Sequence, residues 1–501
     1  MFANAAALDN PPALPDLAAE MLAFVRTAAA QGTAIHEVER GLWQRLLHLG
    51  RTALGHFFDL QGDGDLGPTV TLPDGKVCER LPELHERRYV SIFGAFALAR
   101  TAYGSREGQK IDFVPLDNRL QLPESAFSYV LQDWDQGLCV EQAFGQAQST
   151  VARMLNLKQS VDSLEQTNQQ MAELVQDFRE DRPRPDPATE GPILVTSGDG
   201  KGIVLRRVAD DPAPPAHRSK GQRASQKRMA TVGTAYTVQR QVRTAQEVAA
   251  ALFRDGPKPP PRPQPCHKRV WASLPQEDEA GGVRSGLDIV YEWLLNEVAE
   301  RNPGLAKEMV HLGDGQEALW QARRDHLPAH NTTDILDLLH VTPRLWQAAH
   351  VFHPEGTEAA AAFARDRIVR VLRGEVAGVV QGLRRMGTQW GLRGAKKKTL
   401  AQVCAYLLKN RERMRYDEYL AKGYPIASGV IEGACRHLVK DRMERAGMHW
   451  TPAGAQAMLD LRSTYVNGDW EEYQAYRIQR ETRRLYPHRH LVEGPQFCMA
   501  V

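Results

Sequence analysis

The apolar positions of this chain change their spacing several times along its length. Between about 20 and 55 they recur every three to four residues, as at Leu42 and Leu46, which is typical of amphipathic helices. Around 85–115 the spacing shortens toward two, which predicts a small β-hairpin or meander. The segment 62–75, rich in Gly, Asp and Pro, separates the two patterns. We therefore expect a mostly helical N-terminal region followed by a short β element.

A second helical pattern contains an internal break. Apolar residues at 139–155 keep a period of 3.6, a short turn follows at 156–158, and Ser160 is placed to cap the next helix. Helix, turn and helix fit either a DNA-binding helix-turn-helix or an ordinary helical hairpin. Asp162 and Glu165 on the second helix disfavour contact with phosphates.

The middle of the chain alternates between strand and helix patterns. A proline-rich stretch at 182–187 predicts a stiff linker ahead of this region. Alternating strands and helices are typical of an α/β domain, and we expect a mixed sheet. The predicted elements are a strand at 192–196 that ends near Asp199, a strand at 230–238, a helix at 285–300 and a strand at 308–312 that ends near Asp314.

The segment 355–422 is helical in period and locally basic, with about two basic residues for each acidic one. Three of its cations, Lys396, Lys397 and Lys398, are consecutive. A last helical pattern covers 428–446 and includes Glu432.

Composition limits the class of protein. The 501 residues are 42% hydrophobic and 25% charged, values typical of a globular protein with more than one domain. The net charge is only +2, so any surface for nucleic acid must come from local segregation of charge. Six scattered cysteines without a Cys-x-x-Cys pair argue against a zinc ribbon and a disulfide framework. No run is long and apolar enough for a membrane span, so we expect a cytoplasmic protein.

Three carboxylates occupy similar settings beside glycines. Asp199 and Asp314 each follow an apolar strand pattern, and Glu432 begins a helical one. Such residues can converge on divalent cations, which prefer carboxylate oxygens, and two ions about 3.5–4 Å apart suit phosphodiester chemistry. We expect the three to lie close enough to share a metal pair, with the glycines leaving room for substrate. Arg436 and Lys440 follow Glu432 at four-residue intervals, as in a solvated ion-pair ladder or in cations that face a phosphate.

Several motifs together resemble the ISKra-type insertion-sequence transposases, bacterial DDE enzymes similar to the Mutator-like superfamily. The resemblance covers about residues 85–465. Its motifs are Gly198–Gly202, Lys227–Gly233, His267–Ala272, Gly313–Gly315, Asp334–Val341, Ile431–Met443 and Gly447–Trp450.

The resemblance implies a ribonuclease H-like mixed-sheet core interrupted by an all-helical insertion, with a mostly helical N-terminal DNA-binding region. It implies that Asp199, Asp314 and Glu432 bind two Mg²⁺ or Mn²⁺ ions. Such enzymes cut double-stranded DNA at element ends and join the freed 3′-hydroxyl to target DNA, acting as homo-oligomers on DNA of the bacterial nucleoid. Asp337 and His340 resemble a supporting Asp-x-x-His element; the alternative is a helix-start Asp and a packed His.

The same resemblance suggests a division of the chain and a set of DNA contacts. Trp450 could stack on a base or belong to the core, and Arg436 and Arg442 could bind phosphates or pair with neighbouring acids. The expected DNA contacts are Arg436, Lys440, Arg442, Trp450, Lys396, Lys397 and Lys398. The expected regions are 1–84 (helical), 85–182 (β-hairpin and helix-turn-helix-like), 190–345 (first part of the core), 346–422 (insertion), 423–468 (second part of the core) and 469–501 (tail).

The leading hypothesis is thus an active DDE transposase. A catalytically silent, domesticated DNA-binding protein with the same fold is the alternative. A nuclease that cuts without joining strands is a third hypothesis.

Overall fold

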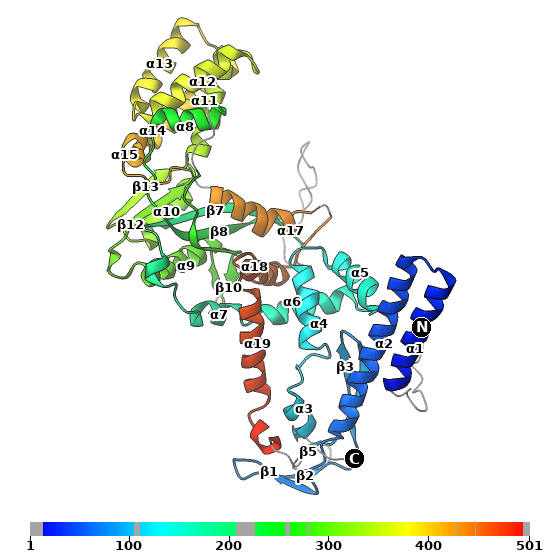
Figure 1. Cartoon of the computed structure of the whole chain (residues 1–501). Helices are drawn as coiled ribbons and strands as arrows, with labels where there is room; N and C mark the ends of the chain where they lie inside the picture. The colour runs from blue at the N-terminus through cyan, green and yellow to red at the C-terminus, as the bar shows by residue number, and fades with distance from the viewer. Residues whose placement is uncertain are drawn as a thin grey trace, which may run out of the picture. The chain divides into compact units, whose positions relative to one another are not determined.

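The computed structural model describes residues 14–104, 111–206, 226–255, 261–277, 280–427, 429–445 and 447–493. It divides into two compact units, one made of residues up to Met171 together with those from Glu471 onward, and the other running from Ala172 to Trp470. Figure 1 labels their helices and strands. In the described part of the chain, no helix is both long and apolar enough to cross a membrane.

The first unit begins with two helices and two small antiparallel sheets. The predicted helical start is confirmed, and so is the hairpin, in which Ser91 pairs with Gly94 across a two-residue turn. A separate four-stranded sheet has the order β1-β2-β5-β6, so two of its strands precede the hairpin in the sequence and two follow it. The elements are α1 (Leu14–Gln31), α2 (Ile35–Gln61), β1 (Thr69–Thr71), β2 (Val77–Arg80), β3 (His85–Ser91), β4 (Gly94–Arg100), β5 (Tyr103–Gly104) and β6 (Ile111–Phe113).

The predicted helix–turn–helix is present in this unit. The first helix ends at Asn156, whose φ of 55° is left-handed, and Ser160 caps the second helix by accepting a hydrogen bond from the Ser163 amide at 3.0 Å. A buried amide pair joins the second of these helices to the helix that contains Gln136, since Asn168 donates to Gln136 at 2.8 Å. Whether these helices bind DNA stays a prediction. The helices are α3 (Pro115–Leu120), α4 (Tyr129–Cys139), α5 (Phe144–Leu155) and α6 (Val161–Ala172).

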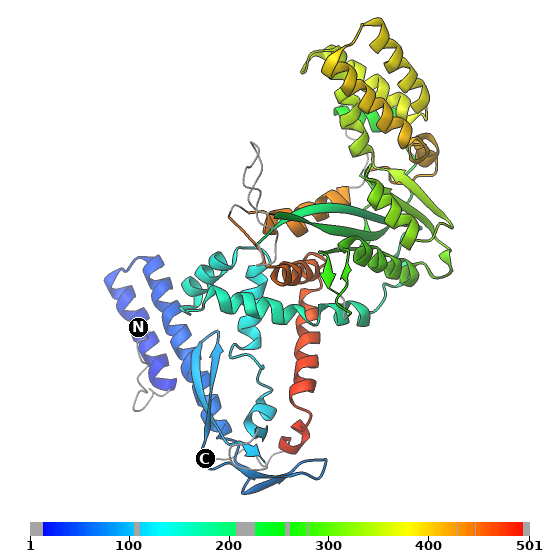
Figure 2. The same cartoon turned by 180° about the vertical axis from the view of Figure 1, so that it is seen from behind.

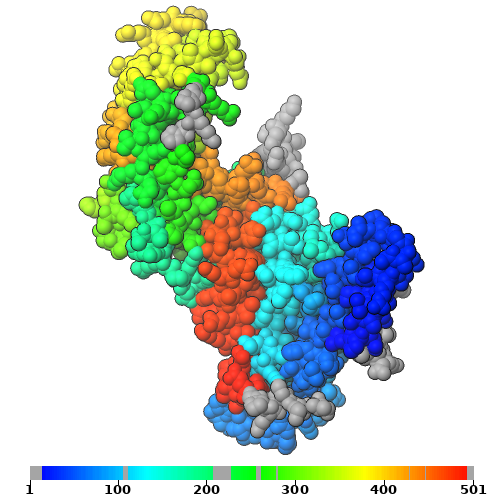
Figure 3. Space-filling view, viewed as in Figure 1, coloured from blue at the N-terminus to red at the C-terminus, as the bar shows by residue number. Residues whose placement is uncertain are grey.

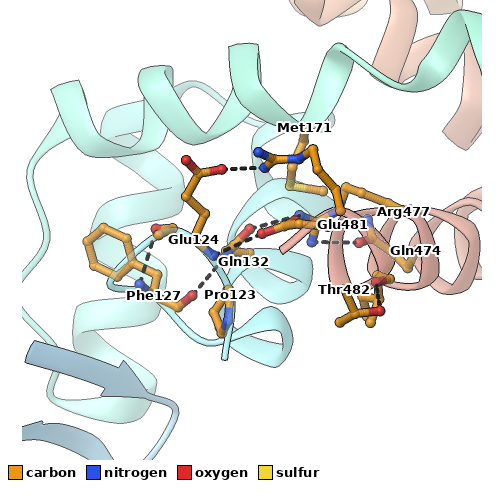
Figure 4. A network of polar contacts seen from close by, with 12 residues as sticks. Pro123, Glu124, Phe127, Gln132, Met171, Gln474, Arg477, Glu481 and Thr482 are labelled. Carbon is orange, nitrogen blue, oxygen red and sulfur yellow. Dashed lines mark hydrogen bonds and ion pairs between the residues drawn. The ribbon is translucent and has the colours of Figure 1, made fainter. Parts of the chain in front are cut away.

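The C-terminal helix α19 (Trp470–Leu485) packs within the first unit. Buried Arg477 donates to Gln132 of α4 at 3.1 Å and to Gln474 at 3.3 Å (Figure 4). The hydroxyl of Tyr473 donates to the carbonyl of Met171. The described part of the predicted tail is therefore a structural partner of the N-terminal region, a pairing that the separate boundaries of our prediction did not include.

A five-stranded mixed sheet forms the centre of the second unit, in the order β13-β12-β7-β8-β9. β12 pairs in parallel with β7 and β13, whereas β7, β8 and β9 are antiparallel, so the predicted mixed α/β sheet is confirmed. Figure 2 shows the long ribbon of β7 and β8 from behind. The strands are β7 (Ile193–Leu205), β8 (Gln226–Val238), β9 (Cys266–Ser273), β12 (Glu308–Gly313) and β13 (Thr332–Leu336); β10 (Gln276–Glu277) and β11 (Val283–Arg284) form a separate small hairpin.

Strand β7 is longer than the sequence predicts. It does not end at Asp199 but continues to Leu205, because β8 pairs with it residue by residue over its whole length. The glycines at 198, 200 and 202 are thus strand residues. Strands β9 and β13 were not predicted as strands, since β9 begins with polar residues and β13 is only five residues long.

Helices cover both faces of this sheet. Ser285 caps α9 (Gly286–Arg301) by accepting from the Asp288 amide at 3.1 Å, which confirms the predicted helix. Helix α10 (Glu317–His326) follows β12, and α18 (Pro452–Val466) packs beside β9. The predicted helix over 428–446 is interrupted. Its described part consists of α16 (Gly429–Ala434), a π-helical turn (Cys435–Lys440) and α17 (Asp441–Met443), and the first residue of the prediction, Ser428, lies outside the described residues.

A helical layer extends this unit at one end, drawn in yellow in Figure 3. The segment predicted as an insertion is helical, but the layer also includes α8, which comes from between β8 and β9 and packs against α12. A large apolar core, including Leu345, Phe363 and Leu407, continues from the sheet into this layer. The helices are α8 (Ala245–Phe253), α11 (Leu338–Phe352), α12 (Glu358–Leu372), α13 (Val376–Gln389), α14 (Gly394–Lys409) and α15 (Tyr416–Ala421).

A buried charge cluster fixes the starts of two central strands. Glu190, just before β7, accepts from Arg301 at the end of α9 at 2.7 Å and also pairs with Lys307, just before β12. The side chains of Glu190 and Arg301 are each only 2% exposed. Charges this deeply buried are tolerated only as partners, so the cluster ties the entries of β7 and β12 together.

We predict that Glu190→Ala destabilises the protein by about 3 kcal/mol, because it removes the nearer of two carboxylates from the buried Arg301 guanidinium and leaves only Glu297, at 3.5 Å. Urea unfolding of the full chain would measure this change. Glu292→Ala is the matched control: its side chain is 48% exposed and pairs with Arg284, so its removal should change stability by only about 0.5 kcal/mol. Equal effects of the two variants would contradict the structural role of the cluster.

Candidate functional site

The register of the parallel strands aligns three aspartates. Leu312 of β12 pairs with Ser197 of β7, and two residues further along the two strands come Asp314 and Asp199. Gly313 of β12 pairs with Leu336 of β13, and the next residues are Asp314 and Asp337. Because neighbouring strands are about 4.8 Å apart, the three backbones bring Asp199, Asp314 and Asp337 into one row. We call this row with Glu432 the acidic edge.

The three aspartates share one face of the sheet. Residues that are paired in register point to the same side, and side chains alternate along a strand. The preceding residues of the same parity, Val195, Val310 and Ile335, all belong to the core that is shared with α11 and the helical layer. The opposite parity faces α9, where a Cβ on Gly198 would lie 2.7 Å from the Tyr291 hydroxyl.

Glu432 approaches this row from the helix that packs across β7 and β8. Ile431, Ala434 and Leu438 on this helix are buried, while the Glu432 side chain remains accessible. The π-helical turn that follows directs Cys435 toward the sheet, where its Sγ donates to Oδ2 of Asp199 at 3.4 Å. Wide turns of this kind occur frequently at functional sites.

Two carboxylates of the acidic edge, Asp314 and Glu432, have raised pKa values. Burial, and then the charge of Asp199, raises the pKa of Asp314, and the amide of Gln316 and nearby His340 partly offset this effect. Burial, followed by Asp337 and Asp199, raises the pKa of Glu432, with His340 again acting in the opposite direction. Burial and Asp199 also raise the pKa of the Cys435 thiol well above its usual range. The acidic edge is thus an electrostatically coupled group that resists carrying its full negative charge.

Electrostatic interaction among these carboxylates does not by itself show that their side chains are positioned around a metal ion. Among the described residues, no group of three or more His, Cys, Asp or Glu side chains is close enough to hold a metal ion as it stands. That the three carboxylates share a metal pair stays a prediction. One oxygen of Asp199 accepts from Cys435, and Oδ1 of Asp314 accepts from the Gln316 amide at 2.7 Å, so both side chains have local partners.

The glycines beside the aspartates have a different role from the predicted one. Aromatic side chains take up the space: Trp320 lies 2.9 Å from a Cβ built on Gly313, and Tyr406 lies 2.4 Å from one on Gly315. These glycines therefore let large rings pack against the strand ends, rather than leaving open room for substrate.

Asp337 and His340 of the Asp-x-x-His element lie at the start of a helix and also near the other carboxylates of the acidic edge. Asp337 is a helix-start residue, since its Oδ1 accepts from the Leu339 amide of α11 at 2.8 Å and it is only 2% exposed. It also belongs to the aspartate row, and His340 is near enough to lower the pKa of both Asp314 and Glu432. The motif thus caps α11 and completes the acidic edge.

The predicted DNA contacts fall into two groups. Arg436 and Lys440 are exposed, and Arg436 lies 3.6 Å from Asp441; Lys396, Lys397 and Lys398 are exposed in the first turn of α14. Arg442 is fully buried and lies 4.9 Å from the ring of Trp450, which is 7% exposed and donates to the carbonyl of Met443. Arg442 and Trp450 are core residues here and do not present their side chains to DNA.

Three further residues near the acidic edge were not singled out from the sequence. Lys201 lies on the same face of β7 as Asp199 and is 3.8 Å from Glu444. Arg344, one helical turn after His340 on α11, lies over the ring of Tyr406 at 4.9 Å. Burial, with smaller contributions from Asp314 and Asp337, raises the pKa of Tyr406 to about 12. Spacing after the Asp-x-x-His motif could have indicated Arg344, because residues four apart share a helix face.

No protein-family model matches the chain, and no curated protein matches it. Among solved structures, the chain is similar to the Drosophila P element transposase strand transfer complex, with 10% sequence identity over 79% of this chain and 90% of that chain, and a TM-score of 0.23. A likeness of this degree carries no argument, so conclusions about function rest on the geometry of the chain itself.

We predict that Asp314→Asn stabilises the metal-free protein at pH 8. The folded-state pKa of Asp314 is raised, so the native state binds this proton more tightly than the unfolded state, and its charged form costs stability above the ordinary carboxyl pKa. Asn keeps an acceptor for the Gln316 amide. The midpoint of thermal unfolding in EDTA should rise by about 1–3 °C, and the difference should vanish as the pH falls toward 4.

The neighbouring acid Glu317 supplies a control of opposite sign. Hydrogen bonds from Lys409 and Arg324 lower its pKa to about 2, so Glu317→Gln should not raise the midpoint at any pH. A midpoint that Asp314→Asn leaves unchanged at pH 8 would contradict the electrostatic description of the acidic edge.

Proposed function

We propose that this protein is a DDE-type transposase that cleaves DNA at the ends of an insertion sequence and joins the freed strand to target DNA. The observation that carries the proposal is the acidic edge, where Asp199 and Asp314 are aligned on one face of the sheet and Glu432 arrives from a helix across it. The mixed sheet with a helical layer between Asp314 and Glu432 fits the ribonuclease H-like core that the sequence motifs imply.

Asp199, Asp314 and Glu432 would hold two Mg²⁺ or Mn²⁺ ions. The donors fit in type, since hard divalent cations prefer carboxylate oxygens. The placement of Asp199 and Asp314 after adjoining parallel strands supports this assignment for two of the three donors. Two such ions activate the attacking oxygen and stabilise the leaving oxygen of a phosphodiester. The raised pKa values of Asp314 and Glu432 support a site that gains from added positive charge.

The surrounding residues would position the DNA strand. His340 borders both Asp314 and Glu432, and Lys201 and Arg344 offer cations on either side of the aspartate row. Exposed Arg436 and Lys440 on the helix of Glu432 would contact phosphates, which Arg and Lys bind readily. The partner is double-stranded DNA of the bacterial nucleoid, bound in the cytoplasm by a homo-oligomer of this chain.

A second candidate is a catalytically silent DNA-binding protein of the same fold. The observation that favours it is the absence, among the described residues, of a group of three side chains closed around a metal position. The two candidates differ in one measurable property, since only the transposase needs a divalent cation for a chemical step.

We predict that, with Mg²⁺, the wild-type protein joins pre-cleaved DNA ends to a plasmid target, and that Glu432→Gln and Asp199→Asn each reduce joining by on the order of 1000-fold. The probes are short duplexes with free 3′ ends taken from the DNA that flanks the coding sequence. Both variants should bind these duplexes in EDTA as the wild type does. Asp325→Asn, an exposed aspartate of α10, is the matched control and should retain joining.

Joining by all four proteins would show that Glu432 and Asp199 are misassigned. Binding without joining in any protein would favour the silent DNA-binding protein. Cleavage of uncut flanking duplexes without joined product would favour a nuclease.

A further inference from the structure

The helical layer carries a stretch with charge of one sign. Residues 376–411, which include α13 and α14, contain eight basic side chains and no acidic one. Lys409 and Arg411 have acidic partners at 3.0 and 2.9 Å, whereas the other six are exposed and, within the part of the chain that the structure describes, form no ion pair. Of these six, Arg384 contacts Cys404 and the remaining five do not. The five are Arg385, Arg393, Lys396, Lys397 and Lys398, and we call them the cationic turn.

The cations at the start of α14 do not stabilise the helix. Positive side chains in the first turn oppose the helix dipole, and the N-cap Arg393 makes no capping hydrogen bond. Gly391 and Gly394 both have left-handed φ values, 58° and 56°, so the loop between α13 and α14 is a tight reversal that brings the exposed cations close to the end of α13. An external anion explains this arrangement better than internal packing does.

An exposed tryptophan stands within the cationic turn. Trp390, at the end of α13, is 56% exposed. Its ring packs edge-on against Phe352 at 5.5 Å and lies 6.3 Å from His353, so it is held in place from one side. A large, supported aromatic ring with exposed cations before and after it in the sequence has the composition of a surface that binds a nucleic-acid strand by stacking and by phosphate contacts.

Helix α14 connects this surface to the acidic edge. Its residue Tyr406 packs against Gly315, the residue after Asp314, and Arg344 lies over the same ring. From Lys397 to Tyr406 the helix rises about 13 Å at 1.5 Å per residue. That length corresponds to about four nucleotides of a strand at 3.4 Å each. A strand with one phosphate at the acidic edge would therefore reach the cationic turn within a few nucleotides.

We propose that Trp390 stacks on an unpaired DNA base while the cationic turn binds the phosphates on either side of that base. Bases inside a duplex are already stacked on each other, so an indole held at the surface gains a partner only where a strand is single or its end is open. The inference rests on the proposed function, because it takes DNA as the polymer, and it adds a preference for unpaired DNA near the reacting end.

The test measures binding of the full-length protein in EDTA, where no DNA chemistry occurs. The probes are a blunt 20-base-pair duplex, the same duplex with a five-nucleotide single-stranded overhang, and a polyglutamate peptide. The wild type should prefer the overhang probe, and Trp390→Ala should lose that preference by on the order of tenfold while its blunt-duplex affinity is unchanged. Trp390→Phe should keep part of the preference, which separates lost stacking from lost folding.

Two matched variants complete the design. Replacement of Lys396, Lys397 and Lys398 by Gln should weaken binding to both DNA probes alike and reduce the slope of log affinity against log salt by roughly 0.7–0.9 for each lost contact. Tyr465→Ala removes another exposed aromatic of the same unit, 38% exposed and packed edge-on against Trp470 at 5.8 Å, and should change neither affinity.

An overhang preference that survives Trp390→Ala, or equal loss with Tyr465→Ala, would overturn the proposal. Polyglutamate binding as strong as that of the overhang probe would also overturn it in favour of an acidic protein partner. Failure of strand joining in Mg²⁺, with the overhang preference intact in EDTA, would reject the transposase and leave the DNA surface standing.

Discussion

The parallel pairing of β12 with β7 and β13 is the constraint on which the acidic edge depends. Asp199, Asp314 and Asp337 are far apart in the chain, and only this register brings them into one row. A shift of one residue in either pair would turn an aspartate to the opposite face, toward α9. The buried Glu190 cluster ties together the starts of β7 and β12 and so fixes their register. The same register aligns the aspartates at the opposite end of the paired segments.

The helical layer extends the same core and is not an appendage to it. Its apolar residues are continuous with those beneath the aspartate row, and α14 reaches the strand ends through Tyr406. The tight contact between Tyr406 and Gly315 explains why glycine follows Asp314. An added side chain would displace the ring and, with it, the helix that carries the cationic turn.

Helices and their caps could be predicted from the sequence, whereas the pairing of the strands could not. The cap Ser160 follows from spacing and side-chain chemistry, and the structure confirms it, as it confirms the helix predicted over 285–300. The full length of β7 depends on its partner β8, and the short β13 has no clear period, so the alignment of Asp337 with the other aspartates was not predicted. The burial of Arg442 was missed for a related reason: the π-helical turn before it changes the helical phase on which a 3.6-residue projection relies.

The cations near the acidic edge do not neutralise its negative charge. Within the described residues, Lys201 pairs with Glu444 and Arg344 lies over Tyr406, so neither cation neutralises the aspartate row directly. A protein selected only for stability would place a cation among carboxylates that lie close enough to raise the pKa of Asp314 and Glu432. Lys201 and Arg344 have other partners instead, which agrees with the proposal that the row binds divalent cations from solution and that nearby cations bind a phosphate strand. The cost in stability at the acidic edge and the free cations on α14 are therefore two parts of one electrostatic arrangement.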